Sequence, residues 1–237
     1  MGNIANNLTV VRERIARSAE RSGRAAQSVR LVAVTKTLTV EGISEAIQAG
    51  VTEFGENRVQ EAAQKYGVDI GAVKLNEAGL TLHLIGSLQR NKARQAAGLF
   101  DYIQSIDRPE IVKSLAAAYD EREGDQKLPV LIQVDLTGEE SKAGVSPANL
   151  PGLVDAVLAA DNLQGTGLMT IARLGADEGE LRHTFSTLRF LLDGLRRSHG
   201  LDWLELSMGM SNDYEFAIEE GATMVRLGRI LFGEREV

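Results

Sequence analysis

A chain of 237 residues, 43% of them hydrophobic, is long enough for one large core and falls within the range of a single α/β barrel. Its formal charge of −7 argues against a broad surface for nucleic acid or anionic membrane, since both need clustered Lys and Arg. The absence of cysteine excludes disulfides and thiolate nucleophiles, and the three histidines are scattered without metal-ligand spacing, so no metal site is expected.

The start of the chain, "MGNIANNLTVVRER", lacks a basic region followed by an apolar run. No apolar stretch in the sequence approaches the length that spans a bilayer. We therefore expect a cytoplasmic protein.

In chain order, apolar residues at helical spacing predict a first helix over residues 4–22, and a buried strand follows at 31–35. Seven further strands are predicted at 52–54, 81–85, 102–106, 130–136, 165–169, 203–207 and 224–228. Amphipathic helical segments such as 40–50, 108–123 and 177–200 lie between them.

Strands that alternate with helices pair in parallel, and a closed (β/α)8 barrel leaves no strand edge exposed. We therefore predict an α/β fold, a single TIM barrel over residues 1–237 with an extra N-terminal helix. A doubly wound open sheet is the alternative fold.

Polar residues follow the predicted strands at the end where such barrels carry their working groups. Lys36 follows the first strand, Glu56 and Asn57 the second, Lys142 lies in the loop after the fifth, and Met169 ends the sixth. At any one position this means little, because loops are polar anyway. Their recurrence around the ring favours a site at the mouth of the barrel.

The segment "SMGMSNDYEFAI" at 207–218 is the most informative. Residues 211–213 are all N-cap types, so a helix is predicted to begin there, and its first N–H groups suit a phosphate. Gly209 would let the backbone approach a ligand, and Gly228 with Arg229 would add a second loop to the phosphate site. A tight turn before a well-capped helix is the structural alternative.

If the even-numbered residues of the first and last strands face the lumen, alternation along these strands makes Lys36 and Arg226 both point into the mouth. A desolvated lysine near another cation loses its proton more easily and becomes a nucleophile able to form a Schiff base, whereas a lysine that reaches outward would be structural. A lysine with a phosphate site fits either a sugar phosphate, as in a class I aldolase, or pyridoxal 5′-phosphate. An arginine on the pyridine nitrogen would leave that ring a poor carbanion stabiliser.

Segments that follow one another along essentially the whole chain carry a resemblance. They are "LVAVTK", "FGENRVQE", "HLIGSLQRNKA", "SIDR", "ESKAGV", "GLMTI", "LSMGMSNDYEFAIEEGATMVRLG" and "FGER". Together they make the chain resemble the pyridoxal phosphate homeostasis protein family, which is related to the barrel domain of bacterial alanine racemase.

The resemblance implies that Lys36 holds pyridoxal 5′-phosphate as a Schiff base, that Arg226 faces the pyridine nitrogen and that Asn57 lies near the ring. Many relatives carry a small hydroxyl residue where this chain has Arg229, so the guanidinium either replaces that phosphate contact or points outward. The cofactor-binding residues expected are Lys36, Asn57, Met169, Ser207, Met208, Gly209, Ser211, Arg226, Gly228 and Arg229.

The implied role is in intracellular vitamin B6 and amino-acid homeostasis, as a non-catalytic carrier or regulator with no catalytic residue. The implied partners are apoenzymes or a regulatory protein, without nucleic acid or membrane, and we expect a monomer. The alternative is a pyridoxal phosphate-dependent amino-acid racemase or a Schiff-base aldolase of the same fold. A protein-interaction module would leave the ordered rim of polar groups unexplained.

Overall fold

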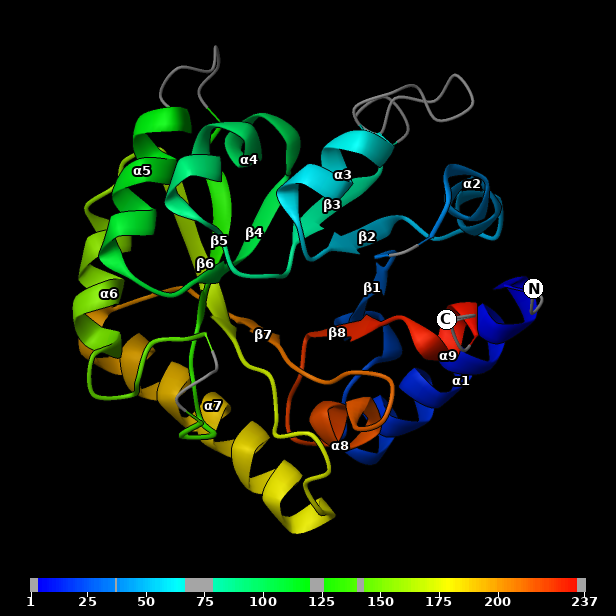
Figure 1. The fold of residues 1–237 in the computed structure, drawn as a ribbon. Coiled ribbons are helices and arrows are strands. Elements are labelled where there is room, and N and C mark those ends of the chain that lie inside the picture. Colours follow the sequence, from blue (N-terminus) through cyan, green and yellow to red (C-terminus); the bar gives the residue numbers. More distant parts are fainter. Residues whose placement is uncertain (1–3, 37, 67–78, 120–125, 140–142, 234–237) are drawn as a thin grey trace.

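The computed structural model describes residues 4–36, 38–66, 79–119, 126–139 and 143–233. Eight parallel strands close into a barrel in chain order, and helices surround it (Figure 1). The strands are β1 (Arg30–Val34), β2 (Glu53–Glu56), β3 (Thr81–Leu84), β4 (Tyr102–Ile106), β5 (Leu128–Gln133), β6 (Leu163–Met169), β7 (Glu205–Ser207) and β8 (Met224–Leu227). Because β8 pairs with β1, the sheet has no edge, and the predicted barrel is confirmed in place of an open sheet.

The helices make the outer layer, and α1 is the predicted extra helix before β1. Its Asn7 side chain donates a hydrogen bond of 2.9 Å to the carbonyl of Leu231, which fastens it beside α9 (Figure 1). The helices are α1 (Ile4–Arg21), η1 (Ala26–Ser28), α2 (Val40–Gln48), α3 (Val59–Tyr66), η3 (Arg90–Lys92), α4 (Ala93–Leu99), α5 (Pro109–Tyr119), α6 (Leu150–Leu158), α7 (Glu178–His199), α8 (Tyr214–Glu219) and α9 (Arg229–Phe232). Within the described ranges, no helix is both long and apolar enough to cross a membrane.

Only β4 has the predicted bounds, and the other strands differ from the prediction by one to three residues at one or both ends. Two of these ends lie beside identifiable side-chain contacts. Strand β5 ends before Asp135, because the Asp135 carboxylate accepts hydrogen bonds from the backbone and hydroxyl of Thr137 and so closes a turn. Strand β7 begins after Trp203, whose buried ring lies so close to Gly165 that a Cβ there would be 1.9 Å from it. Local side-chain chemistry therefore sets these ends.

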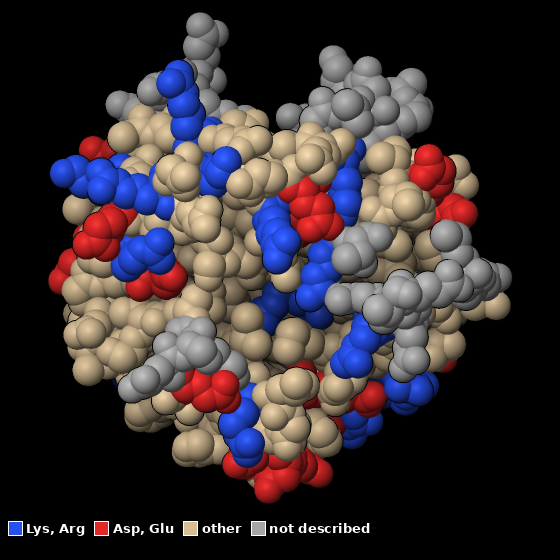
Figure 2. Space-filling view, viewed as in Figure 1, with Lys and Arg blue, Asp and Glu red and all other residues tan. Residues whose placement is uncertain are grey.

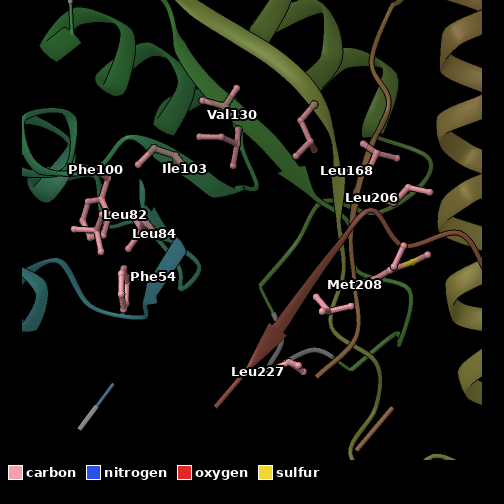
Figure 3. Packing of buried hydrophobic residues seen from close by; sticks show 14 of the residues in the cluster. Phe54, Leu82, Leu84, Phe100, Ile103, Val130, Leu168, Leu206, Met208 and Leu227 are labelled. Carbon is pink, nitrogen blue, oxygen red and sulfur yellow. The ribbon is translucent and has the colours of Figure 1, made fainter. Parts of the chain in front are cut away.

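The main apolar core lies between the strands and the helices. Phe54, Leu82, Leu84 and Phe100 belong to it and lie together in Figure 3. The barrel interior differs, because its apolar cluster is small and charged or polar side chains such as His83 share the lumen. The fold therefore delivers polar groups to the inside of the barrel as well as to its mouth.

Candidate functional site

A cavity of about 1150 Å³ lies at the carboxyl ends of β1, β6, β7 and β8. Lys and Arg side chains surround a hollow near the middle of the face shown in Figure 2. Of the expected cofactor-binding residues, the cavity is lined by Lys36, Ser211, Arg226, Gly228 and Arg229. Those that do not line it are Asn57, Met169, Ser207, Met208 and Gly209, and Lys142 lies outside the described residues.

Three of these other residues serve the packing around the site. Met208 packs in the outer core beside Leu206 (Figure 3), and its N–H donates to the carbonyl of Met224 at 3.1 Å. Met169 is fully buried in the small apolar cluster of the lumen. Asn57 is half-buried, and a Cβ on Gly86 would lie 2.2 Å from its carbonyl oxygen, so this loop packs against the loop after β3.

Gly209 is required by the packing of its loop on α8. Its φ of +95° lies in the left-handed region, and a Cβ there would be 2.9 Å from the Cα of Tyr214 and 2.7 Å from the Cβ of Ala217. Its carbonyl accepts the backbone N–H of Arg226 at 3.0 Å. The close approach that the structure shows at Gly209 is to helix α8, and Gly209 fixes the loop that precedes the cavity wall.

The carboxylate of Asp213 closes the turn before α8. Helix α8 begins at Tyr214, as predicted, and Asp213 accepts the N–H of Met210 at 2.5 Å instead of capping the helix. Burial raises the pKa of Asp213, although the bond from Met210 and the charge of Arg226 favour its ionised form. The N–H of Met210 is therefore occupied inside the turn.

Further backbone N–H groups on the cavity wall are available to bind a ligand. Within the described ranges, the backbone N–H groups of Ser211, Asn212, Gly228 and Arg229 have no hydrogen-bond partner, and all four residues line the cavity. The N–H of Ile230 reaches the hydroxyl of Ser211 at 3.5 Å, which joins the loops after β7 and β8. Unpaired donors on two adjoining loops make a wall that suits an anion.

Arg226 is a buried cation at the base of the cavity. Its Nη1 donates to the Ser207 hydroxyl at 2.6 Å and its Nη2 to the Thr170 carbonyl at 2.7 Å. Burial lowers the pKa of Arg226 to about 10, against the opposing charge of Asp213, so the guanidinium stays charged at neutral pH. No ion pair joins it to a carboxylate of the described residues, which leaves its charge to face the cavity.

Lys36 follows β1, is half-buried and lines the same cavity as Arg226, as alternation along the strands predicted. The backbone beside it is held from behind, because Lys65 Nζ donates to the carbonyl of Thr35 at 2.8 Å and to Glu56 at 3.1 Å. The Thr35 hydroxyl also donates to Glu56 at 2.8 Å. Glu56, which was expected at the rim, therefore lies behind the strand that carries Lys36.

The sequence analysis missed residues that support the site from inside the barrel. Gln104 bonds to the Ser207 hydroxyl at 2.6 Å, and His83 bonds to Gln104 at 2.9 Å. Both side chains are fully buried. Their signal in the sequence is a polar residue at an inward position of an otherwise apolar strand, as in "YIQSI" and "TLHLI".

Comparison with known proteins gives one consistent result. The family model described as "Alanine racemase, N-terminal domain" matches residues 3–236. Proteins of Aquifex aeolicus and Escherichia coli K12, both named pyridoxal phosphate homeostasis protein, are each 41% identical to the chain. The first match covers 99% of both chains, and the second covers 100% of this chain and 98% of the relative.

Solved structures agree with the sequence matches. PipY of Synechococcus elongatus with PLP bound has a TM-score of 0.84 at 36% identity, covering 97% of this chain and 100% of that one. Its structure without PLP has a TM-score of 0.85 over the same shares. Alanine racemase of Corynebacterium glutamicum, at 22% identity, shares the fold with a TM-score of 0.68 over 99% of this chain and 61% of that one.

Proposed function

Because the chain belongs to the pyridoxal phosphate homeostasis protein family, we propose that its cavity binds pyridoxal 5′-phosphate and that the protein carries or buffers this cofactor. Vitamin B6 and amino-acid homeostasis is then its role. The observation that carries the proposal is the meeting, in one cavity, of Lys36, the charged Arg226 and the unpaired N–H groups of two loops. PipY, bound to PLP in its solved structure, supports the same ligand.

The donor set fits the parts of this cofactor. The N–H groups of Ser211, Asn212, Gly228 and Arg229 would hold the phosphate. Arg226 would donate to the pyridine nitrogen and keep it unprotonated, since the guanidinium does not give up its proton at neutral pH. When bound, the cofactor supplies an aldehyde carbon, with which an uncharged lysine amine condenses to a Schiff base as water leaves.

Colour and chemical trapping test this proposal. Protein incubated with pyridoxal 5′-phosphate should become yellow, and borohydride should remove the visible band while fixing the cofactor to a peptide that contains Lys36. Sugar phosphates, treated in parallel, should leave no adduct. A protein that stays colourless with the cofactor but is trapped with a sugar phosphate would instead be a Schiff-base aldolase.

The side chain of Arg229 should strengthen phosphate binding. It is exposed at the cavity rim and, within the described ranges, forms no ion pair. A charge-assisted hydrogen bond at such a place contributes about 1.5 kcal/mol, so Arg229→Ala should weaken cofactor retention about tenfold. Arg173→Ala is a matched control, because Arg173 also lines the cavity but pairs with Glu180 at 2.6 Å.

Equilibrium dialysis against the cofactor measures both variants. Arg229→Ser adds a comparison, since a serine hydroxyl there would replace part of the lost contact. Equal retention by wild type and Arg229→Ala would show that the guanidinium points away from the phosphate.

The protein should lack amino-acid racemase activity. Racemisation needs a second acid/base group on the face of the substrate opposite the lysine. The part of the chain that the structure describes includes all four tyrosines, and none of them lines the cavity. The hydroxyl of Tyr66 bonds to Thr35 behind β1, and that of Tyr102 bonds to Thr166 and Glu205 at the amino end of the barrel. Cofactor-loaded protein with L-alanine in deuterated water should therefore give no D-alanine and no α-deuteration. Turnover that Lys36→Ala abolishes would instead establish a racemase.

A further inference from the structure

A line of hydrogen bonds runs through the barrel lumen from the base of the cavity. Arg226 on β8 donates to the hydroxyl of Ser207 on β7 at 2.6 Å, and Ser207 donates to the side-chain oxygen of Gln104 on β4 at 2.6 Å. The Gln104 amide nitrogen lies 2.9 Å from Nδ1 of His83 on β3, and Nε2 of His83 lies 3.1 Å from Glu53 on β2. The side chains from Arg226 to His83 are all buried.

The hydrogen-bond partners of Gln104 determine which group donates and which accepts in this chain of hydrogen bonds. Its amide nitrogen faces two acceptors, Nδ1 of His83 and the sulfur of Met224, each at 2.9 Å, so its oxygen faces Ser207. The single hydroxyl proton of Ser207 is then committed to Gln104. Its lone pairs are left to accept from Arg226.

The charged groups around His83 keep its Nδ1 an acceptor. Burial lowers the pKa of His83, which leaves the ring neutral, and its remaining proton lies on Nε2 toward Glu53. Burial alone would raise the pKa of Glu53, but hydrogen bonds from His83 and Arg30 bring it below its ordinary value. Arg30 in turn pairs with Glu205 at 2.8 Å, and Tyr102 stacks on the His83 ring.

A lumen filled with branched apolar side chains is the usual interior of this fold, so these polar groups are not needed to fill the barrel. We propose that Gln104 is a positioning residue for Arg226, with His83 fixing the orientation of its amide. The guanidinium is then held at Nη1 through Ser207 and at Nη2 by the Thr170 carbonyl. This inference rests on the proposed function, in which the fixed guanidinium donates to the pyridine nitrogen.

Gln104→Met tests the inference, because it removes the acceptor for Ser207 and the donor for His83 at nearly constant volume. In cofactor-free protein, ¹⁵N NMR of Arg226 should show separate Nη–H signals in the wild type and merged, faster-exchanging signals in the variant. In loaded protein, the visible band should be independent of pH between roughly pH 6 and 9 in the wild type and pH-dependent in the variant, because the ring nitrogen then titrates.

Met224→Leu is the matched control: it removes the sulfur that Gln104 contacts, while Nδ1 of His83 still accepts from the Gln104 amide and keeps its oxygen toward Ser207. It should leave both readouts as in the wild type. A change as large as that of Gln104→Met would assign the effect to packing and overturn the inference. Unchanged Arg226 signals in Gln104→Met would overturn it as well.

Ser207→Ala interrupts the same chain of hydrogen bonds and removes only a hydroxyl. It is therefore the variant to use if Gln104→Met does not fold. It should free the Nη1 group in the same way, and restrained Nη signals in this variant would contradict the inference. A wild type that binds no cofactor, with the guanidinium still released in Gln104→Met, would defeat the proposed function and support the positioning role.

Discussion

Replacing Lys36 with alanine should reduce borohydride-stable incorporation of pyridoxal 5′-phosphate from about one per chain to background. The reason is that the covalent bond needs an amine at the cavity, whereas the N–H groups on the loops after β7 and β8 remain able to hold the phosphate. Lys65 should not substitute, since its Nζ already bonds to Thr35, Glu56 and Glu61. Mass spectrometry of the reduced protein measures incorporation.

The Lys36→Ala variant should also remain folded. Lys36 is half-buried at the barrel mouth, so its removal opens no apolar cavity, and the thermal midpoint of the cofactor-free protein should stay near that of the wild type. Lys113→Ala, at an exposed position of α5, is the control and should incorporate as much cofactor as the wild type. Full incorporation by Lys36→Ala, or a cofactor mapped to another lysine in the wild type, would refute the assignment.

Side-chain alternation predicted that Lys36 and Arg226 both face the barrel mouth, on the assumption that the even-numbered residues of β1 and β8 face the lumen. In the structure, Val32 of β1 pairs with Arg226 of β8. Lys36 lies four residues after Val32, so its side chain leaves the strand on the same side and approaches the same mouth. The same alternation separates Glu53, which reaches His83 in the lumen, from Glu56, three residues on, which faces the helices. Strand parity could therefore have placed Glu56 behind the strand.

Other features depend on contacts between distant elements, which a single sequence does not reveal. Gln104 and His83 lie on neighbouring strands, but their contact depends on the stagger between those strands. The motif around Met208 and Gly209 marked a loop that lines the cavity at residues 210–213, yet the directions of its groups are set by packing against Leu206 and against α8. A sequence motif thus identifies a segment of the site, but tertiary packing determines which of its atoms reach the cavity.

Lys65→Met should lower the free energy of unfolding by about 3–5 kcal/mol at neutral pH, because it leaves the buried carboxylate of Glu56 without its cation. Glu56 is fully buried, and its Oε2 already has no hydrogen-bond partner among the described residues. Loss of the Lys65 bond would also free the Thr35 carbonyl next to Lys36. Urea unfolding of the cofactor-free protein measures the change.

The loss of unfolding free energy in Lys65→Met should increase as the pH rises. Burial raises the pKa of Glu56 above its ordinary value, and loss of Lys65 should raise it further, so the folded variant binds a proton that the unfolded chain has released. The stability of the variant therefore falls as pH rises from the pKa of the unfolded carboxyl to the raised pKa of the folded one, so the loss relative to the wild type should be small near pH 4.5 and large near pH 7.5. The double variant Glu56→Gln/Lys65→Met, which carries no buried charge at this place, should recover most of the loss. A deficit that is the same at both pH values, or that the double variant fails to recover, would mean that Lys65 contributes through packing and not by neutralising Glu56.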